Sequence, residues 1–108
     1  MLTINREDQT RMTIVVCSDF DAEVAGAARA QFEEIAQEWN GDVVMDLTDT
    51  SFLDSSGIGA IVFLFKRLNA RGQSLELSGV SGQPKEIIEM LRIDKAISVN
   101  KSHVRLAS

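Results

Sequence analysis

The chain has 108 residues, of which 44% are apolar and 25% charged, with a net charge of −5. This length suits a single domain over residues 1–108 that buries a hydrophobic core. The acidic balance argues against nucleic-acid binding, which needs a basic surface. No apolar run approaches the ~20 residues of a membrane span, and no signal peptide is evident. We therefore expect a cytoplasmic protein without membrane insertion.

The first two predicted strands, residues 2–5 and 12–17, are separated by a short polar segment and predict an antiparallel hairpin. Residues 12–17 are almost all apolar, which predicts burial on both faces of this strand. Cys17 is the only cysteine, so an intramolecular disulfide is excluded. Because it lies in this apolar run, we expect it to be a small core residue.

A helix is predicted next, with Asp21 as its N-cap. Its apolar residues recur every three or four positions, as expected for one buried helical face. These are Val24, Ala28, Phe32, Ile35 and Trp39. Asn40-Gly41 ends the helix, and Gly41 is expected to adopt the left-handed conformation of a C-cap.

Residues 42–47 predict an interior parallel strand, and residues 57–70 a helix that is apolar around most of its circumference. Such a helix is either packed in the core, which we favour, or leaves a face for a partner. Alternation in residues 74–78 predicts another inner strand.

The end of the sequence contains one more helix and one short strand. Ser81 is the expected N-cap of the helix, which tolerates Pro84 in its first turn. Its predicted buried stripe consists of Ile87, Ile88, Met90 and Leu91. Residues 96–99 predict the final strand, and residues 100–108 are a polar tail without an assigned element.

Alternating strands and helices predict an α/β fold with a mixed, mostly parallel sheet of four to five strands, crossover helices and an N-terminal antiparallel hairpin. Function in such sheets gathers beyond the carboxyl ends of the strands. We expect the segments 19–21, 49–56 and 78–81 to meet at that edge.

Catalytic chemistry has little support. The only histidine, His103, lies in the tail, and the sequence has no Gly-x-Ser-x-Gly elbow, metal-ligand spacing or phosphate-binding glycine loop. We expect no catalytic residue, metal or cofactor. Five aspartates could instead converge on Mg²⁺ as in a response-regulator receiver: Asp19, Asp21, Asp46, Asp49 and Asp54. Against this interpretation, the chain has too few βα units and lacks the receiver-like Met-Pro segment.

Asp54-Ser55-Ser56-Gly57 places two hydroxyls at a helix start. Spacing alone favours a helix cap, because Asp and Ser are preferred there and Gly relaxes the turn. The buried strand before this segment and the apolar helix after it make an interaction site an alternative.

Residues 43–47, residues 52–59 and the pair of segments 79–81 and 93–95 resemble the STAS domain family, most closely its single-domain bacterial anti-sigma factor antagonists. The resemblance covers residues 2–99. It implies that Ser56 is phosphorylated by a serine kinase that often doubles as the anti-sigma factor, and dephosphorylated by a metal-dependent serine phosphatase. The surroundings of the phosphosite and its partner surface would be Asp21, Asp54, Ser55, Gly57, Ile58 and Gly59.

The resemblance also implies a non-enzymatic partner switch, in which unphosphorylated protein binds its kinase and phosphorylated protein releases it. An alternative within the same family is a non-switching subunit of a transporter or signalling scaffold. One departure concerns Arg92, which replaces a glycine often found before the Leu/Ile-Asp-Lys segment.

Overall fold

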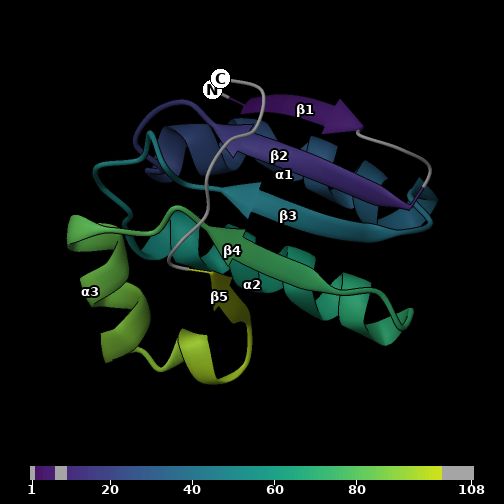
Figure 1. The fold of residues 1–108 in the computed structure, drawn as a ribbon. Coiled ribbons are helices and arrows are strands. Elements are labelled where there is room, and N and C mark those ends of the chain that lie inside the picture. The colour runs from purple at the N-terminus through teal and green to yellow at the C-terminus, as the bar shows by residue number, and fades with distance from the viewer. Residues whose placement is uncertain (1, 7–9, 101–108) are drawn as a thin grey trace.

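The structure, a computed structural model, describes residues 2–6 and 10–100. Its elements are β1 (Leu2–Arg6), β2 (Arg11–Val16), α1 (Ala22–Glu38), β3 (Asp42–Asp46), α2 (Ser55–Ala70), β4 (Leu75–Ser78), α3 (Gly82–Met90), the 3₁₀ helix η1 (Ile93–Lys95) and β5 (Ser98–Asn100). The strands form one sheet in the order β1-β2-β3-β4-β5. β1 pairs with β2 antiparallel, and the other pairs are parallel. The predicted α/β fold is confirmed (Figure 1).

The core lies between the sheet and the two long helices, α1 and α2, which run side by side along one face (Figure 1). The parallel register places Met12 beside Val43 and Ile14 beside Met45, and all four side chains are buried. Successive residues of a strand point to opposite faces, so these residues share the face toward the helices. Because both helices cross over between parallel strands, they run in the same direction.

Two predictions about the β2 region are wrong. Thr13 and Val15 are only half-buried, because α1 and α2 cover one face of β2 and its alternate residues point away from them. Cys17 is exposed rather than in the core, since it lies just beyond the end of the strand. Its sulfur is 3.5 Å from the Thr3 hydroxyl. The middle strand β3 is buried on both faces, as predicted for an interior strand.

The start of α1 matches its prediction, and its end does not. Asp21 is the N-cap, and its Oδ1 accepts a hydrogen bond from the amide of Val24 at 3.0 Å. The helix ends in an extended residue, Trp39, and Gly41 does not have a positive φ. Gly41 instead allows a close chain approach, because a Cβ there would lie 2.6 Å from the Thr10 carbonyl oxygen.

Two further helix predictions need correction. α2 begins at Ser55, two residues before the predicted start, because Asp54 serves as its N-cap. In α3, Met90 and Leu91 are 73% and 51% exposed, contrary to the predicted buried stripe. Ile88 is buried, but the helix ends at Met90, so the last two apolar side chains are not carried back onto the core.

The chain after α3 takes a tight turn that the sequence prediction did not include. Arg92 has a left-handed φ of 59°, a conformation that glycine adopts most easily. This backbone conformation accounts for the glycine often found here in the family that the sequence resembles. The turn and η1 move the last strand to Ser98–Asn100, slightly later than the predicted 96–99. Residues 101–108, which include His103, lie outside the described part of the chain.

Candidate functional site

The loops that leave the carboxyl ends of the parallel strands meet at one edge of the sheet, as predicted. Phe20, after β2, and Leu53, before α2, form an isolated parallel bridge. The Phe20 amide donates to the Phe52 carbonyl at 2.9 Å, and the Asp54 amide donates to the Phe20 carbonyl at 3.4 Å. The segment before α2 is therefore held against the loop before α1.

Gln83 in the first turn of α3 joins the third loop to this arrangement. Its Nε2 donates to the Leu53 carbonyl at 2.9 Å, and its Oε1 accepts from the Leu53 amide at 2.8 Å. One side chain thus satisfies both backbone groups of a fully buried residue. Sequence reasoning missed Gln83, because a contact between an amide side chain and a distant backbone leaves no local pattern.

The turn after β3 is fixed by hydroxyl and carboxylate contacts. The buried Thr50 hydroxyl donates to the Val16 carbonyl at 3.2 Å. Asp46 Oδ1 accepts from the Thr48 amide at 2.9 Å and from the Thr48 hydroxyl at 2.6 Å. These contacts tie the polar loop to the ends of β2 and β3, so the start of α2 is presented from a well-anchored segment.

The start of α2 presents the two predicted hydroxyls. Asp54 Oδ1 accepts from the amides of Ser56 at 2.9 Å and Gly57 at 3.0 Å, which satisfies two of the free N–H groups of the first turn. Ser55 is exposed and Ser56 is half-buried. Within the described part of the chain, the Ser56 hydroxyl accepts and donates no hydrogen bond. It remains available for modification or for a partner.

The remaining predicted site residues divide into surface and buried positions. Asp21 caps α1 beside this segment, and Gly59 is exposed on α2. Gly57 is buried because the chain passes so close that a Cβ would lie 2.3 Å from the Phe20 carbonyl oxygen. Ile58 is also buried and packs in the core. Gly57 and Ile58 therefore position the helix start.

A groove of about 470 Å³ runs between α1 and α2 and includes Ser56 in its wall. Its lining residues are Ala22, Ala25, Gly26, Arg29, Phe32, Ser56, Gly59, Ala60 and Phe63. The Arg29 guanidinium lies 4.9 Å from the centre of the Phe63 ring. Sequence reasoning missed this groove, because it depends on how the small residues of two helices face each other.

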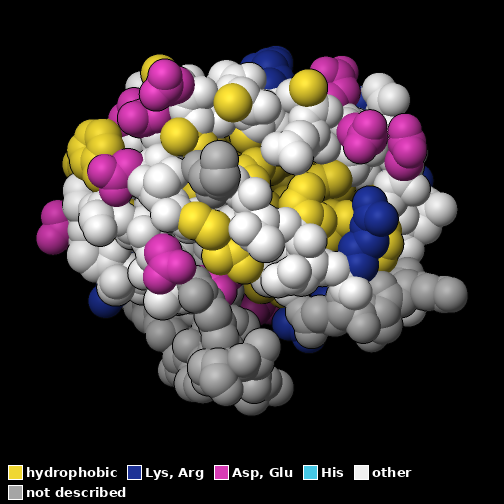
Figure 2. Space-filling view, turned by 90° about the horizontal axis from the view of Figure 1, so that it is seen from above, with side chains coloured by type: hydrophobic (Ala, Val, Ile, Leu, Met, Phe, Trp, Pro, Cys, Tyr) yellow, Lys and Arg dark blue, Asp and Glu magenta, His cyan; other side chains and the backbone are white. Residues whose placement is uncertain are grey.

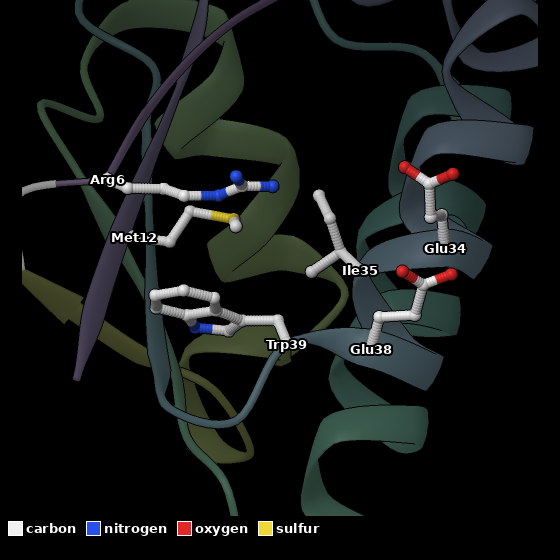
Figure 3. Close-up of a pocket in the computed structure, with 6 residues that line it drawn as sticks. All are labelled: Arg6, Met12, Glu34, Ile35, Glu38 and Trp39. Carbon is white, nitrogen blue, oxygen red and sulfur yellow. The ribbon is translucent and has the colours of Figure 1, made fainter. Parts of the chain in front are cut away.

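A second hollow, of about 250 Å³, lies among β1, β2 and the last turns of α1 (Figure 3). The Arg6 guanidinium is 5.9 Å from the Trp39 ring, while Glu34 and Glu38 extend from α1 at the rim. On the face of the molecule shown in Figure 2, hydrophobic side chains lie scattered among polar ones. Met12 lies near the start of β2 and Trp39 directly follows α1, so this hollow lies at the opposite end of the sheet from Ser56.

The aspartates considered for a receiver-like site have structural roles where their contacts are defined. Asp21 and Asp54 are N-caps, and Asp46 binds the Thr48 turn. Within residues 2–6 and 10–100, no three His, Cys, Asp or Glu residues are grouped so that they could hold a metal ion. None of the helices in this part of the chain is long and apolar enough to cross a membrane.

Comparison with known proteins identifies the class of fold. Residues 3–106 match the STAS domain family, and the chain belongs to this family. Its sequence is similar to the anti-sigma-B factor antagonist of Listeria monocytogenes, with 30% identity over 99 residues that cover 91% of this chain and 86% of that protein.

Two solved proteins share the fold. A Thermotoga maritima protein, provisionally assigned as an anti-sigma factor antagonist, has a TM-score of 0.85 and 16% identity, covering 94% of this chain and 86% of that chain. The anti-sigma factor antagonist SpoIIAA in its unphosphorylated form has a TM-score of 0.76 and 16% identity, covering 95% and 90%. SpoIIAA from Bacillus is also known in a phosphorylated form.

Proposed function

We propose that this protein is a phosphorylation-controlled partner-switching regulator of the anti-sigma factor antagonist type, and that Ser56 is its phosphosite. Unphosphorylated protein binds a cytoplasmic serine kinase that also acts as an anti-sigma-type factor. The kinase transfers the γ-phosphoryl group of ATP to Ser56 Oγ, leaving ADP, and the complex separates. A metal-dependent serine phosphatase restores the hydroxyl by hydrolysis. The protein itself does not catalyse either step.

The observation that carries this proposal is the position of Ser56. Its unbonded hydroxyl stands in the first turn of α2, at the edge where three loops meet, and beside the groove between α1 and α2. Phe52, 44% exposed, adds an apolar side chain just before the same helix start. An exposed aromatic residue next to a modifiable hydroxyl suits a partner surface. The names of the similar proteins support the class of partner.

Phosphorylation is expected to change binding and leave the fold intact. A phosphate adds roughly −1.5 to −2 charges. At a helix N-terminus the dipole and free N–H groups favour an anion, so α2 should persist. The penalty falls on the complex, through repulsion, desolvation and bulk. Each loss of about 1.4 kcal/mol weakens binding about tenfold, so a few kcal/mol are enough to release the partner.

The test is mass spectrometry of affinity-tagged protein from its native cells, with identification of co-purified proteins. We expect acid-stable phosphate on Ser56, with a kinase retained by Ser56→Ala and lost from Ser56→Asp. Ser55→Ala is the matched control and should behave as wild type. Loss of structure in Ser56→Asp, or unchanged kinase binding, would contradict the mechanism. A membrane transporter as stoichiometric partner without phosphate turnover would support the non-switching alternative.

A further inference from the structure

The groove beside Ser56 contains a cation that the proposed switch does not yet use. Arg29 of α1 lines the same groove as Ser56 of α2. Among the described residues, Arg29 forms no ion pair, and its recorded contact is the stacking on Phe63. The Phe63 ring is half-buried, but Arg29 is exposed. The contact of a solvated guanidinium with a ring is a weak interaction that a stronger partner can replace.

Residues on the two helices face each other in order along the groove. Ala22 and Ser56 lie at its N-terminal end, and Arg29 and Phe63 lie two turns further along the parallel helices. Seven residues correspond to about 10 Å of helix. Helical side chains lean toward the N-terminus of their helix, so the long Arg29 side chain can extend toward Ser56.

The space between these two residues is open. A Cβ added at Gly26 or at Gly59 would have no atom within 4 Å, apart from its own helix backbone and chain neighbours. Both glycines line the groove between Ser56 and Arg29. A phosphate and a guanidinium can therefore meet over them without displacing other side chains.

Electrostatics favour this meeting once Ser56 carries a phosphate. Asp54 caps α2 and Asp21 caps α1 at the same end of the groove, so a phosphate there stands among carboxylates. Arg29 is the cationic residue among those lining the groove. A charge-assisted arginine–phosphate pair is short, often bidentate and stronger than an exposed cation–π contact.

We propose that Arg29 is a phosphate latch: on phosphorylation of Ser56 it leaves the Phe63 ring, pairs with the phosphate and closes the groove between α1 and α2. This inference rests on Ser56 as the proposed phosphosite. It extends the switch from an added charge to a change in surface shape, because the paired groups fill the space that a partner could enter.

The test uses full-length protein with phosphoserine incorporated genetically at position 56, so it does not depend on finding the kinase. ³¹P NMR titrations compare wild type, Arg29→Gln, Arg29→Lys and Lys66→Gln, the last losing the same charge from an exposed site outside the groove. We expect the phosphate of Arg29→Gln to titrate at higher pH than that of wild type. Arg29→Lys should be intermediate and Lys66→Gln like wild type. Phosphorylation should also shift the Arg29 Nε resonance as the side chain leaves Phe63.

Identical titrations for wild type and Arg29→Gln, with an unchanged Arg29 resonance, would overturn the latch. That result would leave the proposed switch standing, because phosphate charge alone could still release the partner. Conversely, the expected NMR changes could be found in phosphorylated protein that still binds its kinase. That result would refute the switch and support the latch. The two proposals therefore fail separately.

Discussion

Two glycines of α2, two residues apart, differ in whether the structure has room for a side chain. A Cβ at Gly57 would lie 2.3 Å from the Phe20 carbonyl oxygen and 2.7 Å from Leu53 Cδ1, whereas a Cβ at Gly59 would meet open space. We expect Gly57→Ala to destabilise the fold by about 1–3 kcal/mol, because backbone must move. Gly59→Ala should stabilise it by about 0.5–1 kcal/mol, because alanine favours a helix. Urea denaturation of both variants measures this, and equal effects would contradict the packing.

Local chemistry decided which single residues the sequence could predict. Asp21 was correctly predicted as an N-cap, because a cap depends on neighbours two or three positions away. Asp54 lies in the segment expected at a helix start, but it caps a helix that begins two residues earlier than predicted. Gly41 is of the residue type expected at a C-cap. In the structure it instead allows close approach of the Thr10 backbone, which is distant in sequence. Cys17 shares the apolar character of β2 but lies past its end. The partner roles of Ser55 and Ser56 stay predictions.

At the scale of elements, Gln83 couples α3 to the start of α2. Gln83→Ala would leave the amide and carbonyl of the buried Leu53 without their partners. We expect a loss of about 2 kcal/mol or more in the free energy of unfolding, with faster hydrogen exchange at Leu53. Gln37→Ala, on the exposed face of α1, is the control and should change stability by less than about 0.5 kcal/mol. Unaltered exchange at Leu53 in Gln83→Ala would disprove the coupling.

The end of α1 depends on Arg71, which follows α2. Its guanidinium donates to the carbonyls of Ala36 and Trp39, the latter at 3.2 Å, and to Asn40 Oδ1 at 2.7 Å. These bonds satisfy carbonyls that a helix end leaves free. Arg71→Ala should lower stability by about 1–2 kcal/mol in urea denaturation followed by Trp39 fluorescence.

Arg67→Ala is the matched control for Arg71→Ala. Arg67 forms a 3.8 Å ion pair with Glu33 between two exposed side chains, and its guanidinium lies 5.5 Å from the centre of the Phe63 ring. Both contacts are weak, so Arg67→Ala should cost less than about 1 kcal/mol. A control variant as unstable as Arg71→Ala would mean that charge on α2, and not the cap of α1, sets the stability.

Element predictions succeeded where hydrophobic spacing was regular and failed at ends. Ala28, Phe32 and Ile35 of the predicted face of α1 are buried. At its two ends the prediction is only partly right, because Val24 is half-buried and Trp39 lies half-buried after the last helical residue. In α3, Met90 and Leu91 continue the apolar pattern, yet the helix stops and leaves them exposed. The cause is the left-handed turn at Arg92, and an arginine gives no local signal for such a turn. The groove lined by Arg29 and Phe63 could not be predicted, because it depends on which sides of α1 and α2 face each other.

At the scale of the molecule, the order of elements was sufficient to predict the sheet. Parallel strands joined by helices must place their carboxyl ends at one edge, so the meeting of the loops near Phe20, Leu53 and Gln83 followed from topology. The contacts that join those loops did not follow, because they depend on side-chain positions. The preference for Ser56 over Ser55 as the proposed phosphosite came from the family resemblance of residues 52–59 and not from topology.

The two ends of α2 should act independently. Ser56 and Arg71 are fifteen positions apart, about 22 Å along the helix, in a molecule whose principal extents are 32 × 29 × 26 Å. Neither shares a contact partner with the other. We therefore expect the stability effects of Ser56→Asp and Arg71→Ala to add within about 0.5 kcal/mol in the double variant, measured by urea denaturation.

The same independence should hold for binding. Arg71→Ala should keep wild-type affinity for the proposed kinase partner at temperatures where the variant stays folded, while Ser56→Asp should lose affinity with little change in stability. A coupling well above 0.5 kcal/mol, or weakened binding by Arg71→Ala, would show that the N-terminal turn of α2 communicates with its far end. In that case a phosphate on Ser56 would act by altering the whole helix, and the local account of the switch, by charge and groove closure at the helix start, would be wrong.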